Sequence, residues 1–249
     1  MTSDMQESPH ILSVYDRDLE AIQARIMKMG GLVESAIQKS ASSLEMRDEA
    51  LAEEVRQGDI VIDDLEEQIN EETARLIALR APTAVDLRMI LSVMKIAGNL
   101  ERIGDLSKNM AKRTGVLIQM QTIPGAPAAL RRMAREVELM LKDALDAYIQ
   151  RDERLAQDVI QRDADVDQMY NATFREFLTF MMEDPRNITA CMHLHFIAKN
   201  IERMGDHVTS IAEQVIFLVS GETPREQRPK ADKTSLDPKL SPDVDEAGD

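Results

Sequence analysis

Apolar residues recur along most of the chain every three or four positions, which is the spacing of one face of an α-helix. Alternating runs of β-branched and aromatic residues, which would indicate strands, are scarce. The pattern therefore predicts an all-α protein whose helices each turn an apolar stripe toward a core. The two most regular stripes contain Ile96, Leu100, Ile103 and Met110 in one segment and Ile197, Ile201, Met204, Val208 and Ile211 in another.

Interruptions of this periodicity divide the chain into six helical segments. Pro82 and Pro185 each break a helix, and the stretch QTIPGAPAA at 121–129 is the strongest internal break. Asp48 and Thr83 stand where an N-cap residue is expected, directly before a helical segment. We expect helices over residues 11–46, 49–80, 84–120, 127–150, 152–184 and 188–220.

A repeated motif indicates internal duplication. The chain reads NLERIGDL from residue 99 and NIERMGDHV from residue 200, and the breaks at Pro82 and Pro185 precede the two copies at similar distances. The repeat predicts two tandem three-helix bundles, at residues 10–122 and 126–221. Residues 222–249 are rich in proline and charge and have no apolar period, so we expect a disordered acidic tail.

Acidic residues four positions apart occur in both copies of the repeat. Glu101 and Asp105 lie one helical turn apart, roughly opposite the apolar stripe, and Glu202 and Asp206 repeat this arrangement. We therefore expect both pairs on the surface. Carboxylates grouped in this way suit a hard or borderline cation, and their duplication favours a metal site. The alternative is an ion-pair network with Arg102 and Arg203. The candidate metal ligands are Glu101, Asp105, Glu202, Asp206, Asp59, Asp63, Asp163 and Asp167.

Other residues in the motifs favour structural roles. Glycine inside a helix costs about 1 kcal/mol relative to alanine. Gly104 and Gly205 therefore predict close approach of a neighbouring helix, with room for a bound group as the alternative. His195 and His207 flank the second motif and have no histidine counterpart in the first, so we expect structural or surface roles for them. The chain has no phosphate-binding loop and no ExxH metal motif, and nothing in it supports catalysis.

Composition excludes several classes of function. The formal net charge of −15 argues against binding to nucleic acids and against unassisted attachment to an anionic membrane. The single cysteine, Cys191, permits neither an intramolecular disulfide nor a thiolate zinc site within one chain. The N-terminal segment is polar, so we expect no signal peptide, and no stretch reaches the roughly 20 apolar residues of a membrane span. We therefore expect a cytoplasmic location.

Two three-helix units that each end in a helix with the motif N-x-E-R-x-G-D resemble the PhoU family of bacterial phosphate-transport accessory and regulatory proteins. The resemblance extends around the motifs through PTAVDLRMILSVMKIAGN and NITACMHLHFIAKN, and YDRDLEAIQARIMKMGGLVESAI fits the family's first helix. It covers residues 10 to 222, and the charged C-terminal tail extends past the family's usual end.

The resemblance implies a fold of two three-helix bundles and a non-enzymatic function in phosphate uptake. Proteins of this family repress the phosphate (Pho) regulon and couple the ATPase subunit of the Pst phosphate importer to a phosphate-sensing histidine kinase. The resemblance thus implies these two partners, a homodimer, contact with membranes only through partners, and no organic cofactor. It also implies divalent or iron-type metal ions on the family's E(D)xxxD motifs, which here are the eight acidic residues named above.

Three alternatives remain at this level. The chain could be a helical accessory protein of another phosphate transporter, or a scaffold with or without bound metal. A di-metal helical-bundle enzyme is the third, and the missing ExxH ligands argue against it.

Overall fold

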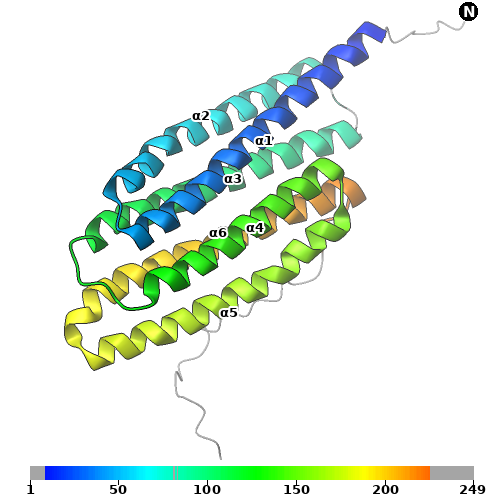
Figure 1. Cartoon of the computed structure of the whole chain (residues 1–249). Coiled ribbons are helices and arrows are strands. Elements are labelled where there is room, and N and C mark those ends of the chain that lie inside the picture. The colour runs from blue at the N-terminus through cyan, green and yellow to red at the C-terminus, as the bar shows by residue number, and fades with distance from the viewer. Residues whose placement is uncertain (1–8, 81, 83, 225–249) are drawn as a thin grey trace, which may run out of the picture.

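The computed structural model describes residues 9–80, 82 and 84–224. These residues form long α-helices and one short 3-10 helix, with no strand among them, as the apolar periodicity predicts (Figure 1). The expected disordered tail lies almost entirely outside the described residues. The elements are α1 (Pro9–Met46), α2 (Glu49–Arg80), α3 (Ala84–Leu117), α4 (Ala126–Gln150), α5 (Glu153–Glu183), η1 (Pro185–Asn187) and α6 (Ile188–Ser220).

Side-chain caps explain where several helices begin. The Oδ1 atom of Asp48 accepts a hydrogen bond from the backbone N–H of Leu51 at 3.0 Å, directly before α2. Asp152 caps α5 in the same way, accepting from the N–H groups of Arg154 and Leu155. Such caps satisfy N–H groups that have no partner inside the helix. The second predicted cap, Thr83, lies outside the described residues.

The end of α3 differs from the prediction, because the helix stops at Leu117 and not at residue 120. The guanidinium of Arg47, which follows α1, donates to the carbonyl oxygens of Ile118 and Met120 and to the hydroxyl of Thr122. These bonds occupy carbonyl groups at the end of the helix, so the chain leaves the helical path one turn early. The donor is about 70 positions away in sequence, beyond the reach of local patterns.

The six helices form two three-helix units that pack side by side. Helices α1, α2 and α3 contact one another in the first unit, and α4, α5 and α6 contact one another in the second. Helix α3 packs along α6 and α1 packs along α4, so α2 and α5 lie at opposite edges of the molecule (Figure 1). The arrangement confirms two tandem three-helix bundles, and α3 and α6, which carry the repeated motifs, lie next to each other.

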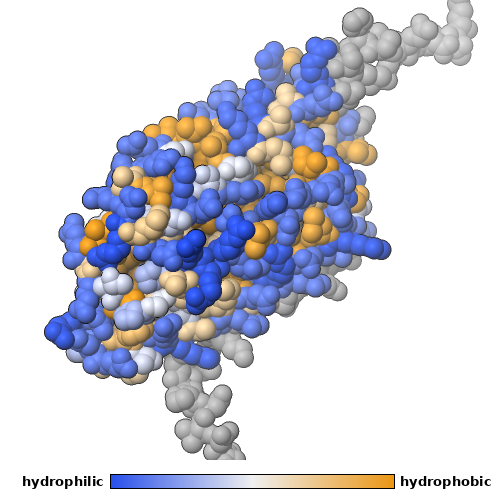
Figure 2. Space-filling view, viewed as in Figure 1, coloured by the Kyte–Doolittle hydropathy of each residue, from blue (hydrophilic) through white to orange (hydrophobic). Residues whose placement is uncertain are grey.

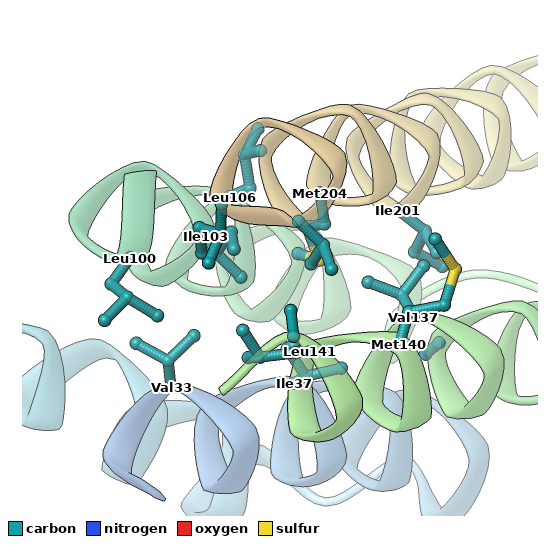
Figure 3. Packing of buried hydrophobic residues seen from close by; sticks show 14 of the residues in the cluster. Val33, Ile37, Leu100, Ile103, Leu106, Val137, Met140, Leu141, Ile201 and Met204 are labelled. Atoms are coloured by element: carbon teal, nitrogen blue, oxygen red, sulfur yellow. The ribbon is translucent and has the colours of Figure 1, made fainter. Parts of the chain in front are cut away.

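One hydrophobic core runs through both units. Figure 3 shows Val33 of α1 pointing toward Leu100 of α3 and Ile37 of α1 beside Leu141 of α4, with further side chains from α3 and α6 above them. The labelled residues of α3 and α6 are Leu100, Ile103, Leu106, Ile201 and Met204. All of these side chains are buried. Because the core is continuous, the two motif-bearing helices are held rigidly against each other.

The outer surface is mainly hydrophilic on the side formed by α1 and α4, with scattered apolar residues (Figure 2). None of the helices in the described residues is long and apolar enough to cross a membrane.

Candidate acidic sites between neighbouring helices

The first acidic cluster consists of Asp59 and Asp63 on α2 together with Glu101 and Asp105 on α3. Asp59 is buried, with 2% of its surface exposed, whereas Asp63 is exposed and the two α3 residues are partly exposed. The ammonium of Lys108, one turn after Asp105 on α3, bonds to Oδ2 of Asp59 and lies 3.3 Å from Oδ1 of Asp105. A cation supplied by the chain therefore bridges the carboxylates of two helices.

The second acidic cluster consists of Asp163 and Asp167 on α5 together with Glu202 and Asp206 on α6. The first three are buried and Asp206 is partly exposed. The ammonium of Lys199 lies 2.8 Å from Oε1 of Glu202. The other carboxylate oxygen of Glu202, Oε2, is buried and has no hydrogen-bond partner. A buried oxygen without a partner is costly, so this cluster has an unmet requirement for positive charge or a donor.

The expectation that the motif acids lie on the surface is wrong for Glu202, and three aspartates of the preceding helices are buried as well. Asp59, Asp163, Asp167 and Glu202 are each less than 7% exposed. The apolar stripe of α6 faces the core, but α6 also packs against α3, α4 and α5, which cover positions beside that stripe. The apolar pattern of one helix does not show that neighbouring helices also bury positions beside its stripe.

The two motif glycines allow the buried aspartates to lie against the helix backbone. A Cβ atom at Gly205 would lie 3.0 Å from Oδ1 of Asp163, and one at Gly104 would lie 3.3 Å from Oδ1 of Asp59. A Cβ atom at Gly205 would press on Asp163, and one at Gly104 would press on Ile62, at 3.2 Å, and on Asp59. The predicted close approach of a neighbouring helix is confirmed at both places. The carboxylate of Asp163 approaches Gly205, and the side chains of Ile62 and Asp59 approach Gly104.

Burial and like charge shift the pKa values of both clusters in the same direction. Burial raises the pKa of Glu202, and the charges of Asp206 and Asp167 add to this, while Lys199 opposes it. Burial and then the charge of Asp59 raise the pKa of Asp63. The hydrogen bond to Asp59 raises the pKa of Lys108, so its ammonium form is favoured. Each cluster thus carries more negative charge than its surroundings readily accommodate.

Arg102 adds to the first cluster from the exposed side. Its guanidinium lies 3.4 Å from Oε2 of Glu101 and 3.8 Å from Oδ2 of Asp105. Together with Lys108 it forms the ion-pair network that the sequence left open as an alternative to a metal site.

The two histidines near the second motif have structural surroundings. His195 lies among the rings of Tyr170, Phe174 and Phe196, with centroid distances of 5.1 to 6.0 Å. Nδ1 of His207 lies 2.9 Å from Oδ1 of Asn99, so this pair joins α6 to α3. Both observations agree with the structural roles expected for these residues.

The family model described as the PhoU domain matches residues 26–114 and again residues 130–215. The chain belongs to the PhoU family. Each PhoU match contains one complete acidic cluster, the first between Asp59 and Asp105 and the second between Asp163 and Asp206. The repeated motif is therefore part of a repeated family domain.

Curated relatives agree with this assignment over nearly the whole chain. A protein of Rhizobium meliloti (strain 1021) named phosphate-specific transport system accessory protein PhoU homolog is 45% identical over 91% of this chain and 95% of its own. A homologue of the same name from Caulobacter vibrioides (strain NA1000 / CB15N) is 44% identical over 91% of this chain and 98% of its own.

Solved PhoU structures have the same fold. The crystal structure of PhoU from Pseudomonas aeruginosa superposes with a TM-score of 0.81 at 38% identity, covering 84% of this chain and all of that one. The phosphate transport system regulatory protein PhoU from Streptococcus pneumoniae gives a TM-score of 0.78 at 28% identity, covering 84% of this chain and 99% of that one.

The acidic clusters supply oxygen donors of the type that a PhoU metal site would need, but they are not assembled around a cation. Within the described part of the chain, no three His, Cys, Asp or Glu side chains converge closely enough to hold a metal ion as they stand. In the first cluster, Lys108 already bridges two of the carboxylates. Each cluster still has one buried oxygen without a hydrogen-bond partner that an added cation would satisfy, Oδ1 of Asp59 in the first and Oε2 of Glu202 in the second.

A repeated set of exposed apolar side chains was not recognised from the sequence. These residues stand at matching places in the two PhoU repeats, on α2 and α3 in one and on α5 and α6 in the other. Isolated exposed apolar residues are ordinary, but the same three positions exposed in both repeats are not. The sequence could have revealed this set through an alignment of the two repeats, which matches apolar residues that lie outside the core stripes. They are Leu79, Leu87 and Leu91 in the first repeat and Met182, Ile188 and Met192 in the second, from 36% to 79% exposed.

Proposed function

We propose that this chain is a cytoplasmic, non-enzymatic accessory protein of a phosphate-specific transport system that represses the phosphate regulon when phosphate is plentiful. The observation that carries the proposal is the PhoU match to both halves, together with relatives at 45% and 44% identity named as accessory proteins of that system. In this role the protein couples the ATPase subunit of the phosphate importer to the phosphate-sensing histidine kinase, and it acts as a homodimer.

The duplicated apolar residues support action through partner binding. Leu87 and Leu91 are one turn apart on α3, and Ile188 and Met192 are one turn apart on α6. Because α3 and α6 are adjacent, the two repeats present matching apolar surfaces from one rigid scaffold. Apolar residues of this kind form the buried centre of protein interfaces.

The test is a binding measurement between the purified full chain and the importer ATPase subunit. The double variant Leu91→Asp with Met192→Asp places a charge on both apolar surfaces, so we expect affinity to fall by about tenfold or more, about 1.4 kcal/mol. Ile60→Asp is the matched control, since Ile60 is 62% exposed on α2 but lies outside the duplicated set. Equal affinities for all three proteins would contradict the role of these surfaces.

We propose that the acidic clusters bind divalent or iron ions as part of this regulatory role. Each cluster contains a buried carboxylate oxygen without a hydrogen-bond partner, Oδ1 of Asp59 in the first and Oε2 of Glu202 in the second. The proposed ligands are Asp59, Asp63, Glu101 and Asp105 in the first cluster and Asp163, Asp167, Glu202 and Asp206 in the second. The proposed ions bind to folded protein and stabilise it, so their removal by a chelator would lower the melting temperature.

A further inference from the structure

The outer sides of α3 and α6 form one face of the molecule. Helices α1 and α4 lie in one layer and α3 and α6 in the other, since α3 packs on α1 and α6 packs on α4 (Figure 1). Helices α2 and α5 cover the two edges. One side of α3 and one side of α6 stay uncovered, and we call these two sides together the α3–α6 face.

Apolar side chains lie at both ends of the α3–α6 face. The two helices run antiparallel, because Arg113 near the end of α3 contacts His193 and Phe196 near the start of α6. Spacings of three, four or seven residues place the exposed positions of each helix on one stripe. The exposed apolar residues of these stripes are Leu87, Leu91 and Val116 on α3 and Ile188, Met192 and Phe196 on α6.

The fully exposed charged residues of α3 and α6 are all basic, and both helices lie wholly within the described residues. Along each helix they fall between the apolar residues, at the same helical spacing. They are Lys95, Arg102 and Lys112 on α3 and Arg203 on α6. The acidic residues of the two helices are buried or only partly exposed, and they are Asp86, Glu101, Asp105, Glu202, Asp206 and Glu213.

Three of these four cations have no carboxylate partner in the described part of the chain. Arg102 pairs with Glu101 and Asp105, but Lys95, Lys112 and Arg203 form no ion pair there. Exposed cations beside apolar residues can meet carboxylates from another molecule without first breaking an ion pair within the chain. The face therefore complements a surface that is both acidic and apolar.

The two edges of the molecule carry the opposite charge. Among the described side chains of α2, six exposed acids stand against Arg56 and Arg75, and on α5 four exposed acids stand against Arg154 and Arg175. A flat anionic membrane would approach these acidic edges together with the face, and a second copy in face-to-face contact would bring basic residues against basic residues. A narrow acidic segment contacts the face alone, so it fits this charge distribution best.

We infer that the α3–α6 face docks an acidic segment of a partner protein that also carries apolar side chains. The inference rests on the proposed action through partner binding and adds the chemistry of the partner's contact. Carboxylates of the segment lie against Lys95, Arg102, Lys112 and Arg203, and its apolar side chains lie against the two apolar ends of the face.

The experiment measures the affinity of the purified full chain for the importer ATPase subunit at increasing salt concentration. The double variant Lys95→Glu with Lys112→Glu reverses two exposed charges that have no carboxylate partner, so we expect about tenfold weaker binding at low salt. Salt screens charges, so the wild-type affinity is expected to fall as salt is raised, and the affinity of the double variant is expected to change less.

Arg132→Glu with Lys142→Glu is the matched control. Both residues are exposed on α4, in the other layer, and the change in net charge is the same as in the test variant. This control is expected to bind nearly as tightly as wild type. Unchanged melting temperatures of the two double variants establish that they are folded.

The outcomes separate this inference from the proposed function. Equal affinities for wild type and the Lys95→Glu, Lys112→Glu variant would overturn the inference, and the proposed function would stand if Leu91→Asp with Met192→Asp still weakens binding. An equal loss in the α4 control would also overturn the inference, because net charge alone would then explain it. No binding by folded wild type would overturn both.

Vesicles of phosphatidylcholine with phosphatidylglycerol test the other anionic partner. The wild-type chain is expected to stay in solution when these vesicles are sedimented. Sedimentation with the vesicles that is lost in the Lys95→Glu, Lys112→Glu variant would assign the α3–α6 face to a membrane and overturn the docking of a protein segment.

Discussion

At the scale of single residues, the motif N-x-E-R-x-G-D combines charged residues with a glycine, which has no side chain. The glycine of each copy makes room for an aspartate from the preceding helix, and the acids of the motif lie beside that aspartate. The glutamate of the motif differs in exposure between the copies, because Glu202 is buried and Glu101 is partly exposed, whereas Asp105 and Asp206 are both partly exposed. The motif therefore organises a contact between two helices in each half.

Gly205→Ala tests this contact. The new Cβ atom would lie 3.0 Å from Oδ1 of the buried Asp163, and the resulting strain of about 1–3 kcal/mol exceeds or offsets the gain of about 1 kcal/mol in helix propensity. We expect no stabilisation in urea unfolding. Gly31→Ala is the control, because nothing lies within 4 Å of its added Cβ, and it should stabilise α1 by up to about 1 kcal/mol. A stabilised Gly205→Ala protein would contradict the packing role of this glycine.

Sequence reasoning selected the eight candidate acids but did not predict their environment. The repeat alone identified all eight acids and both glycines, because the i, i+4 spacing survives in both copies. It assigned Glu202 to the surface, since the pattern of α6 does not reveal that α5 covers its flank. It also did not identify Lys108, whose importance depends on its reaching Asp59, 49 positions away on another helix.

At the scale of helices, local signals predict the elements well and fail where a distant residue intervenes. The caps at Asp48 and Asp152 are formed by side chains next to the helices they begin, and the predicted cap at Asp48 is confirmed. The end of α3 is set by Arg47, which comes from the end of α1, and there the prediction is wrong. The contact between α1 and α4, which joins the two halves, could not be read from the sequence at all.

The α1–α4 contact has a measurable dependence on pH. Burial raises the pKa of Glu34 on α1 above its ordinary 4.5, Glu138 and Asp146 of α4 raise it further, and Lys142 opposes them. Folding therefore favours the protonated form, and this contribution is present below about pH 4.5 and is lost as the pH rises through the folded pKa. We expect Glu34→Gln, measured against wild type by urea unfolding, to gain relative stability between pH 4 and pH 7. A difference that stays constant or falls would contradict this assignment.

At the scale of the whole molecule, duplication produces two similar halves that share one core. The adjacent packing of α3 and α6 places the two motif helices and the duplicated apolar residues on one rigid body. Such a scaffold suits a protein that contacts more than one partner, as the proposed link between importer and kinase requires. The predicted domain limits at 10–122 and 126–221 stay a prediction, because the continuous core does not show whether either half folds alone.

The most direct test of the proposed function is alkaline phosphatase activity in the native host grown in high phosphate, with and without this gene. The account predicts high activity only in the deletion strain, restored to the low level by the wild-type gene. Activity that stays low in the deletion strain would contradict repression of the phosphate regulon by this protein.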